Sequence, residues 1–281
     1  MKKIFILIGA LLLTSGCSLA KDTMENITIY TTSYPIEYLT NELYGENSTI
    51  LSIYPNEIIK LSDKLITDYS RGDLFVYNGL SDEKNYAVEM LNKNRRLMIV
   101  DAAMGMEYSN GIEELWLNPA NFLMLSQNIS NGMKEYITNT YLKNLIDENY
   151  ESLKVKISEI DAEFKLVIEN SDKTGILVAD DALKFLEKYN LNVISLSDKN
   201  LTDRKLLDAK NLIDENKTKY IILIKDVELD KRVEDLLKEK EIEKLFLNPL
   251  TTISEESELN DENYISIMYK NIESLKKELY E

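Results

Sequence analysis

Two stretches of the chain share one pattern, in which short apolar runs alternate with longer amphipathic segments. The runs are rich in β-branched and aromatic residues and are continuously apolar, which is typical of strands buried in a parallel sheet. The segments between most of them show helical spacing. The sequence therefore predicts an α/β fold made of two similar α/β lobes with mainly parallel sheets. The predicted strands are ITIYTTSY, STILSIYP, DLFVYNG and RRLMIVDA in the first lobe, and GILVAD, VISLSD, YIILIKD and KLFLNP in the second.

One long amphipathic segment, residues 139–170, separates the two lobes. Its apolar positions step by three and four residues, which predicts one continuous helix with a narrow apolar stripe and charged flanks. A coiled coil would give a similar stripe, but this stripe is short and lies between two lobes, which favours a rigid connecting helix. The stripe consists of Leu142, Ile146, Tyr150, Leu153, Ile157, Ile160, Phe164 and Val167.

The first sixteen residues have the pattern of a secretory signal peptide. Lys2 and Lys3 precede an apolar run from Ile4 to Leu13, which is too short to span a bilayer in the mature protein. Small residues then lead into Cys17, the sole cysteine of the chain, which has no partner for a disulfide. We expect Cys17 to carry an acyl chain such as palmitate and to anchor the secreted protein to the outer face of the cell membrane. The alternative is a plain signal peptide beside an ordinary cysteine.

These patterns divide the chain into five parts. The division is a signal peptide at 1–16, the lipidated cysteine and a polar tether at 17–26, an N-terminal lobe at 27–138, the connecting helix at 139–170 and a C-terminal lobe at 171–281. The C-terminal lobe is predicted to close on a helix that begins near Glu262, because its apolar residues again show helical spacing.

The charge balance is strongly acidic. The chain has 33 Lys and Arg against 49 Asp and Glu, a formal net charge of −16 at pH 7. Loss of Lys2 and Lys3 with the signal peptide would leave 31 basic residues and a charge near −18. Such a surface repels nucleic acid. The chain also has no histidine, so general-base catalysis would fall to carboxylates alone, and we do not expect an enzyme.

Several polar residues stand where a binding site or a local cap is possible. In EELWLNPAN, Trp116 and its flanking leucines are expected to pack in the core. Asn118-Pro119 is expected to end a strand and start a helix, with Asn118 as the N-cap. Asp180 and Asp181 precede the helical segment ALKFLEKYN. They could be ligands or could cap that helix.

The chain resembles the metal-receptor lipoproteins of ABC transporters, the zinc and manganese solute-binding family. The resemblance covers nearly the whole mature chain and implies a ligand cleft between the two lobes. It rests on the long helix and on the phrases TTSYPIEYLTNELYGEN, DLFVYNGL, LWLNPANFLMLSQNI, FLEKYNL and LFLNPL.

The resemblance also implies the ligand positions, and this sequence fills each of them with an oxygen donor. Glu114 stands two residues before Trp116, where the family has a metal-binding histidine. Glu57 falls near the first histidine, in a loop that looks shortened, so that Asn56 or Asp63 could be the counterpart instead. The third ligand matches Asp180. The fourth matches Asn248, which could otherwise form a simple turn with Pro249.

The resemblance implies a secreted receptor that captures a divalent metal for the permease and ATPase of an ABC importer. Oxygen ligands favour manganese over zinc, because zinc sites normally contain imidazole or thiolate. We expect a monomer that contacts the membrane through its lipid anchor and does not bind nucleic acid. The alternatives are a diverged receptor for another solute, a surface adhesin that has lost metal binding, and, more remotely, a carboxylate-dependent hydrolase.

The lipid anchor can be tested at Cys17. A Cys17→Ala variant should be released from the membrane or remain an uncleaved precursor, because the acylated residue would be missing. Incorporation of labelled fatty acid and membrane fractionation measure this outcome. Unchanged lipid labelling of the variant would show that Cys17 is not the acylated residue.

Overall fold

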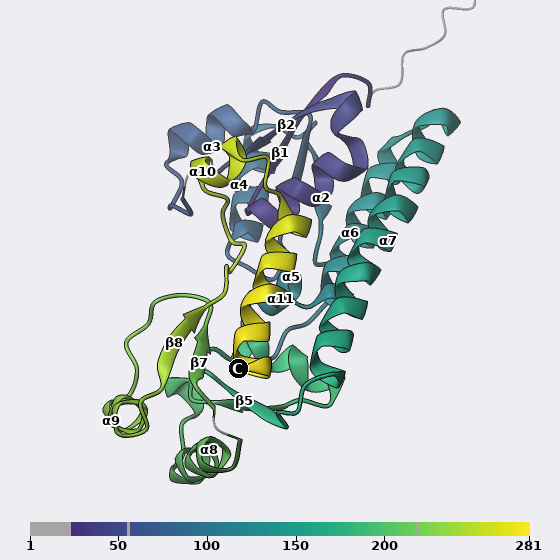
Figure 1. The fold of residues 1–281 in the computed structure, drawn as a ribbon. Helices are drawn as coiled ribbons and strands as arrows, with labels where there is room; N and C mark the ends of the chain where they lie inside the picture. Colours follow the sequence, from purple (N-terminus) through teal and green to yellow (C-terminus); the bar gives the residue numbers. More distant parts are fainter. Residues whose placement is uncertain (1–23, 55–56, 217) are drawn as a thin grey trace, which may run out of the picture.

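Two four-stranded parallel sheets form the centres of the two lobes (Figure 1). The computed structural model describes residues 24–54, 57–216 and 218–281. The strand orders β2-β1-β3-β4 and β6-β5-β7-β8 have the same topology, and every pairing is parallel. The predicted fold class is therefore confirmed. The strands are β1 (Ile27–Thr31), β2 (Ser48–Ser52), β3 (Leu74–Tyr77), β4 (Met98–Asp101), β5 (Gly175–Val178), β6 (Asn192–Ser195), β7 (Tyr220–Leu223) and β8 (Glu243–Phe246).

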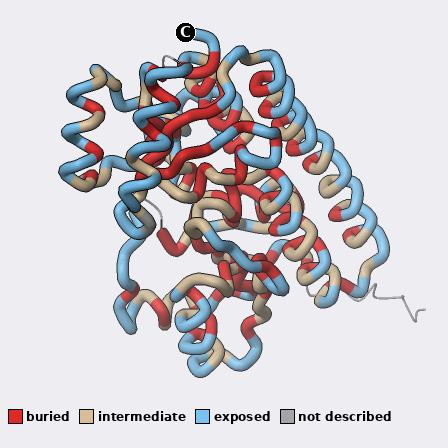
Figure 2. Tube along the Cα trace, turned by 90° about the horizontal axis from the view of Figure 1, so that it is seen from below, coloured by how far each residue is buried: buried red, intermediate tan, exposed pale blue. Residues whose placement is uncertain are grey.

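The inner strands β3 and β5 are buried on both faces of their sheets, and successive side chains of each strand point to opposite sides. In β3, Leu74 and Val76 belong to the large core that extends through both lobes, whereas Phe75 packs in a separate cluster against α3 (Asp63–Tyr69) and α4 (Glu83–Lys93). In the C-terminal lobe, α8 (Asp203–Asn216) and α9 (Lys231–Glu239) cover the outer face in the same way. Every residue of β5 is buried, whereas the edge strands β2 and β8 have only intermediate and exposed residues. Figure 2 shows buried stretches in the interior of the molecule and exposed residues along the outer sides of the helices.

The connecting helix α7 (Thr140–Glu169) is continuous, as the apolar stripe predicts. Seven of the eight predicted stripe residues are buried, and Tyr150 is half-buried. The helix lies alongside α6 (Pro119–Tyr136) and contacts both lobes (Figure 1). Asn139 caps it by accepting a hydrogen bond from the backbone N–H of Tyr141 at 2.8 Å. The two lobes thus share one rigid support.

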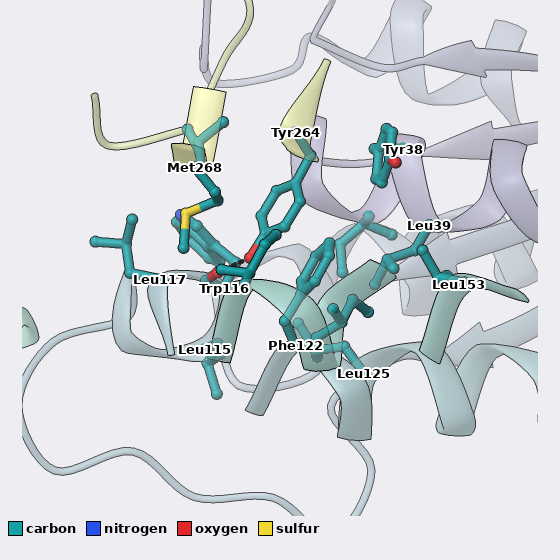
Figure 3. Close-up of a cluster of buried hydrophobic side chains, with 14 of the residues drawn as sticks. Tyr38, Leu39, Leu115, Trp116, Leu117, Phe122, Leu125, Leu153, Tyr264 and Met268 are labelled. Atoms are coloured by element: carbon teal, nitrogen blue, oxygen red, sulfur yellow. Dashed lines mark hydrogen bonds between the residues drawn. The ribbon is translucent and has the colours of Figure 1, made fainter. Parts of the chain in front are cut away.

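The helix α11 (Tyr264–Tyr280) joins the core of the C-terminal lobe to the core of the N-terminal lobe (Figure 3). Its first residue, Tyr264, is fully buried and stacks on Phe122 of α6 with 3.8 Å between ring centroids. The Tyr264 hydroxyl donates to the backbone carbonyl of Trp116 at 2.6 Å. The Trp116 indole N–H in turn donates to the carbonyl of Pro249 at 2.7 Å. The lobes are therefore held by a buried aromatic junction (Tyr38, Trp116, Phe122 and Tyr264) as well as by α7.

Two local predictions need correction or refinement. The expected strand before Asn118 is wrong: residues Glu114–Leu117 form a short helix, α5, because the three apolar residues after Glu114 pack inward from a single turn. Asn118 does cap α6, since its side chain accepts from the N–H of Ala120. The segment Asp181–Tyr189 is a 3-10 helix, η2.

The remaining helices are α2 (Tyr34–Tyr44), η1 (Gly45–Asn47), η3 (Asp198–Asn200) and α10 (Glu255–Leu259).

The signal peptide, Cys17 and most of the tether lie outside the described residues. Within the three described segments, no helix combines the length and the apolar character needed to cross a bilayer.

The hydroxyl of Tyr264 provides a test of the buried junction. A Tyr264→Phe variant keeps the ring stacking but leaves the buried carbonyl of Trp116 without this donor. We expect it to lower the free energy of unfolding by about 1–2 kcal/mol. Urea denaturation measures the change, with Tyr141→Phe as the control because Tyr141 is exposed on α7. Equal stability of the two variants would contradict a structural role for this hydrogen bond.

Candidate functional site

Two adjoining cavities lie between the lobes and together form a cleft. The first has a volume of about 780 Å³ and the second about 770 Å³. They share Ser81, Asp82, Ile112 and Glu113, and these four residues mark the boundary between them. Residues of both lobes line the first cavity, including Glu113 on the N-terminal side and Asp180 and Lys225 on the C-terminal side.

The topology of the sheets explains why the cleft lies here. In an open parallel sheet, ligands bind beyond the carboxyl ends of the strands, at the point where the strand order reverses. In the C-terminal lobe this point lies between β5 and β7. Asp180 follows β5 by two residues and Lys225 follows β7 by two residues, so the fold places them next to each other at the edge of the cleft.

Lys225 forms the central ion pair of the cleft. Its Nζ lies 3.1 Å from Oε1 of Glu113 and 3.5 Å from Oδ2 of Asp180. The carboxylate side chains are only 15% and 17% exposed, whereas Lys225 is 50% exposed. Burial lowers the pKa of Lys225, but the two carboxylates outweigh this effect and hold its pKa above the ordinary value. The ammonium is therefore charged at neutral pH and joins one carboxylate from each lobe.

Neither Glu113 nor its partner Lys225 is predicted as a site residue from the sequence. Resemblance to the family selects Glu114, but consecutive residues of a helix point about 100° apart. In the structure the Glu113 carboxylate lies at the cleft, while Glu114 Oε2 accepts from the backbone N–H of Asn110 at 3.2 Å. Gly111 allows this turn into α5, since its φ of +129° is a conformation that favours glycine. No pattern in the sequence indicates which of the two glutamates faces the cleft.

The other predicted ligands lie in different settings. Asp180 lines the first cavity and also caps η2, because its Oδ1 accepts from the N–H of Ala182 at 2.9 Å. Asp181 pairs with Lys184 at 2.6 Å. Asn248 is exposed, and its Oδ1 accepts from the N–H of Leu250 at 2.8 Å, which is the geometry of a turn.

The first predicted ligand lies at the edge of the described chain. Glu57 is exposed and is not among the residues that line the two cavities. Its alternative Asn56 lies outside the described residues, and the other alternative, Asp63, pairs with Lys93 at 2.6 Å. In the described part of the chain, no three acidic or cysteine side chains come together in a group that could hold a metal ion. The structure therefore does not bring Glu57, Glu114 and Asp180 together as such a group.

A third carboxyl group, Glu83, lines the other cavity. It is 8% exposed, and its Oε2 accepts from the backbone N–H of Asn78 at 3.1 Å. Burial raises the pKa of Glu83, and hydrogen bonding to its carboxyl group offsets only part of that effect. This side of the cleft thus holds a carboxyl group that is costly to ionise.

Comparison with known proteins identifies relatives over nearly the whole chain. The family model for the periplasmic zinc-uptake complex component A matches residues 29–278. The zinc-binding lipoprotein AdcA of Streptococcus pneumoniae strain R6 is 23% identical over 310 residues, which cover 99% of this chain and 61% of AdcA. The high-affinity zinc uptake system protein ZnuA of Bacillus subtilis strain 168 is 21% identical over 313 residues, covering 98% of this chain and 97% of ZnuA.

Solved structures show the same fold. The Zn(II)-bound ZnuA-like domain of Streptococcus pneumoniae AdcA superposes with a TM-score of 0.70 at 21% identity, covering 91% of this chain and all of that domain. The metal-dependent lipoprotein YcdH of Bacillus subtilis gives a TM-score of 0.73 at 20% identity, covering 90% and 99% of the two chains. At this identity the likeness establishes the fold alone. The present chain spans only 61% of full-length AdcA.

The buried carboxyl of Glu83 gives a prediction on stability and pH. A group whose folded-state pKa is raised stabilises the fold below its unfolded pKa, and this contribution is lost as the pH rises through the folded value. A Glu83→Gln variant cannot ionise, so its stability relative to the unmodified protein should increase as the pH rises from about 4 to 7.

Urea denaturation at several pH values measures this difference. The control is Glu89→Gln, which removes an exposed carboxyl from the same helix. Parallel pH profiles for Glu83→Gln and the unmodified protein would show that the Glu83 pKa is not raised in the folded state.

Proposed function

This chain belongs to the periplasmic zinc-uptake component A family, and we propose that it is the extracytoplasmic solute receptor of a metal-type ABC importer. The observation that supports this most directly is the inter-lobe cleft with a carboxylate from each lobe, Glu113 and Asp180, facing the same position. A cation bound there would contact both lobes at once. The chain would deliver it to a membrane permease and its ATPase, as a monomer tethered through Cys17.

The solute proposed is a divalent cation, with manganese ahead of zinc. The chain has no histidine, and its single cysteine, Cys17, lies outside the described residues. The donors available are carboxylate, amide and carbonyl oxygens, which suit hard cations, whereas zinc sites normally include imidazole or thiolate. Relatives of the family are receptors, and we propose no enzymatic reaction for this chain.

A second candidate is a receptor for a different, larger solute in the same cleft. Each of the two cavities has the volume of a pocket for a small organic molecule. The ion pair of Lys225 with Glu113 and Asp180 also satisfies the carboxylates without a metal. Both observations fit a solute that makes hydrogen bonds across the cleft.

Asp180 provides the sharpest test of metal capture. An Asp180→Asn variant keeps an N-cap for η2, because asparagine caps helices as well as aspartate does, but removes one anionic ligand. Isothermal titration of the metal-free protein with MnCl₂ and ZnCl₂ should show tighter manganese binding by the unmodified protein. The variant should bind manganese at least about tenfold more weakly, as expected when a charged ligand is lost.

The control is Glu148→Gln, which removes an exposed carboxylate of α7 away from the cleft and should leave manganese binding unchanged. Tighter binding of zinc than of manganese would overturn the order of the two metals. Absence of any heat or thermal shift with manganese, zinc and calcium would overturn metal capture and favour the second candidate.

A further inference from the structure

The cleft already contains a cation, and that cation is part of the chain. The ammonium of Lys225 lies between Glu113 and Asp180, which belong to different lobes, at 3.1 Å and 3.5 Å. Both carboxylates are largely buried, so the solvent screens them little. A bound divalent cation would have to be attracted by the same two carboxylates.

We propose that Lys225 is an internal competitor of the transported cation, a specificity-determining residue that occupies the cation position between Glu113 and Asp180 and must move aside before a metal binds. This inference rests on the proposed function, because it concerns the same cleft and the same two carboxylates. It assigns to Lys225 a role that the ligand positions implied by sequence do not include.

The chemistry of the lysine side chain makes such a displacement feasible. The ammonium is a compact charge on a flexible four-carbon stem, and half of the side chain is exposed to solvent. It can therefore swing out of the cleft without disturbing the core. Lys225 itself follows β7, whose residues Ile221, Ile222 and Leu223 are fully buried, so the point of attachment stays fixed while the charged end moves.

The expected change in cation affinity follows from the attachment of the competing ammonium to the chain. A tethered group competes at an effective concentration set by its short linker, on the order of millimolar. A cation from solution must outcompete this local charge, so the apparent affinity of the unmodified protein is lower than that of the empty carboxylate pair. Removal of the ammonium should therefore tighten cation binding.

An ordinary structural ion pair would behave differently. A salt bridge with a half-exposed lysine contributes little to stability, and a purely structural role gives no reason for metal affinity to increase when it is removed. The direction of the change in affinity thus distinguishes a competitor from a structural pair.

The experiment compares four proteins by isothermal titration with MnCl₂ and ZnCl₂, after removal of metal with a chelator. The unmodified protein is compared with Lys225→Met, which keeps most of the side-chain volume, with Lys225→Arg, which keeps the charge, and with Lys231→Met. Lys231 is exposed at the start of α9, and the described residues give it no ion pair. It controls for the loss of one positive charge from the same lobe. A Lys225→Gln variant serves if Lys225→Met does not fold.

We expect Lys225→Met to bind manganese at least about tenfold more tightly than the unmodified protein, with Lys225→Arg and Lys231→Met within about twofold of it. Adding Asp180→Asn to Lys225→Met should cancel the gain. Binding by the unmodified protein that is not improved in Lys225→Met overturns the competitor role while the receptor function stands. Binding by Lys225→Met alone overturns metal capture by the native chain and, with it, the competitor role, because the native chain then takes up no cation for which Lys225 could compete. Absence of binding in every variant overturns both.

Discussion

The geometry of the cleft depends on the buried junction that attaches α5 to the C-terminal lobe. Trp116 of α5 donates to the carbonyl of Pro249, and Tyr264 of α11 donates to the carbonyl of Trp116. Glu113 immediately precedes α5, so these two hydrogen bonds also fix Glu113 opposite Asp180 and Lys225. Because the aromatic rings around them are fully packed, the two walls of the cleft cannot separate freely without exposing apolar surface.

The cleft is acidic in a chain that is acidic overall, and the structure balances its carboxyl groups in three different ways. Asp180 accepts a backbone hydrogen bond at the start of η2 and contacts an ammonium. Glu113 pairs with the same ammonium across the cleft. Glu83 has no cationic partner among the described residues, and burial favours its protonated form. Each solution lowers the repulsion that several carboxylates in one cavity would otherwise produce.

The composition of the cleft bears on which cation this chain could bind. The family relatives named above include zinc-binding and zinc-uptake proteins, whereas this chain has no histidine, and Lys225 pairs with two carboxylates of its cleft. Under the proposed function, two features of the cleft act together. Its oxygen ligands would decide which metal it prefers. The tethered ammonium of Lys225 would decide how strongly a cation must be attracted to enter it.

Local sequence determined most of the fold, and tertiary structure decided the site. The stripe on α7, the strands and the cap at Asn118 follow from periodicity and backbone chemistry, which depend on neighbours within a few residues. Resemblance to the family selects Asp180, as the match to its third ligand. The choice of Glu113 over Glu114, and the approach of Lys225 to Glu113, 112 positions away in the chain, depend on how α5 packs against the other lobe. The approach of Lys225 to Asp180, 45 positions away, depends on the pairing of β5 with β7. Side-chain direction and long-range pairing are set by that packing, and the residues themselves carry no pattern that reveals it.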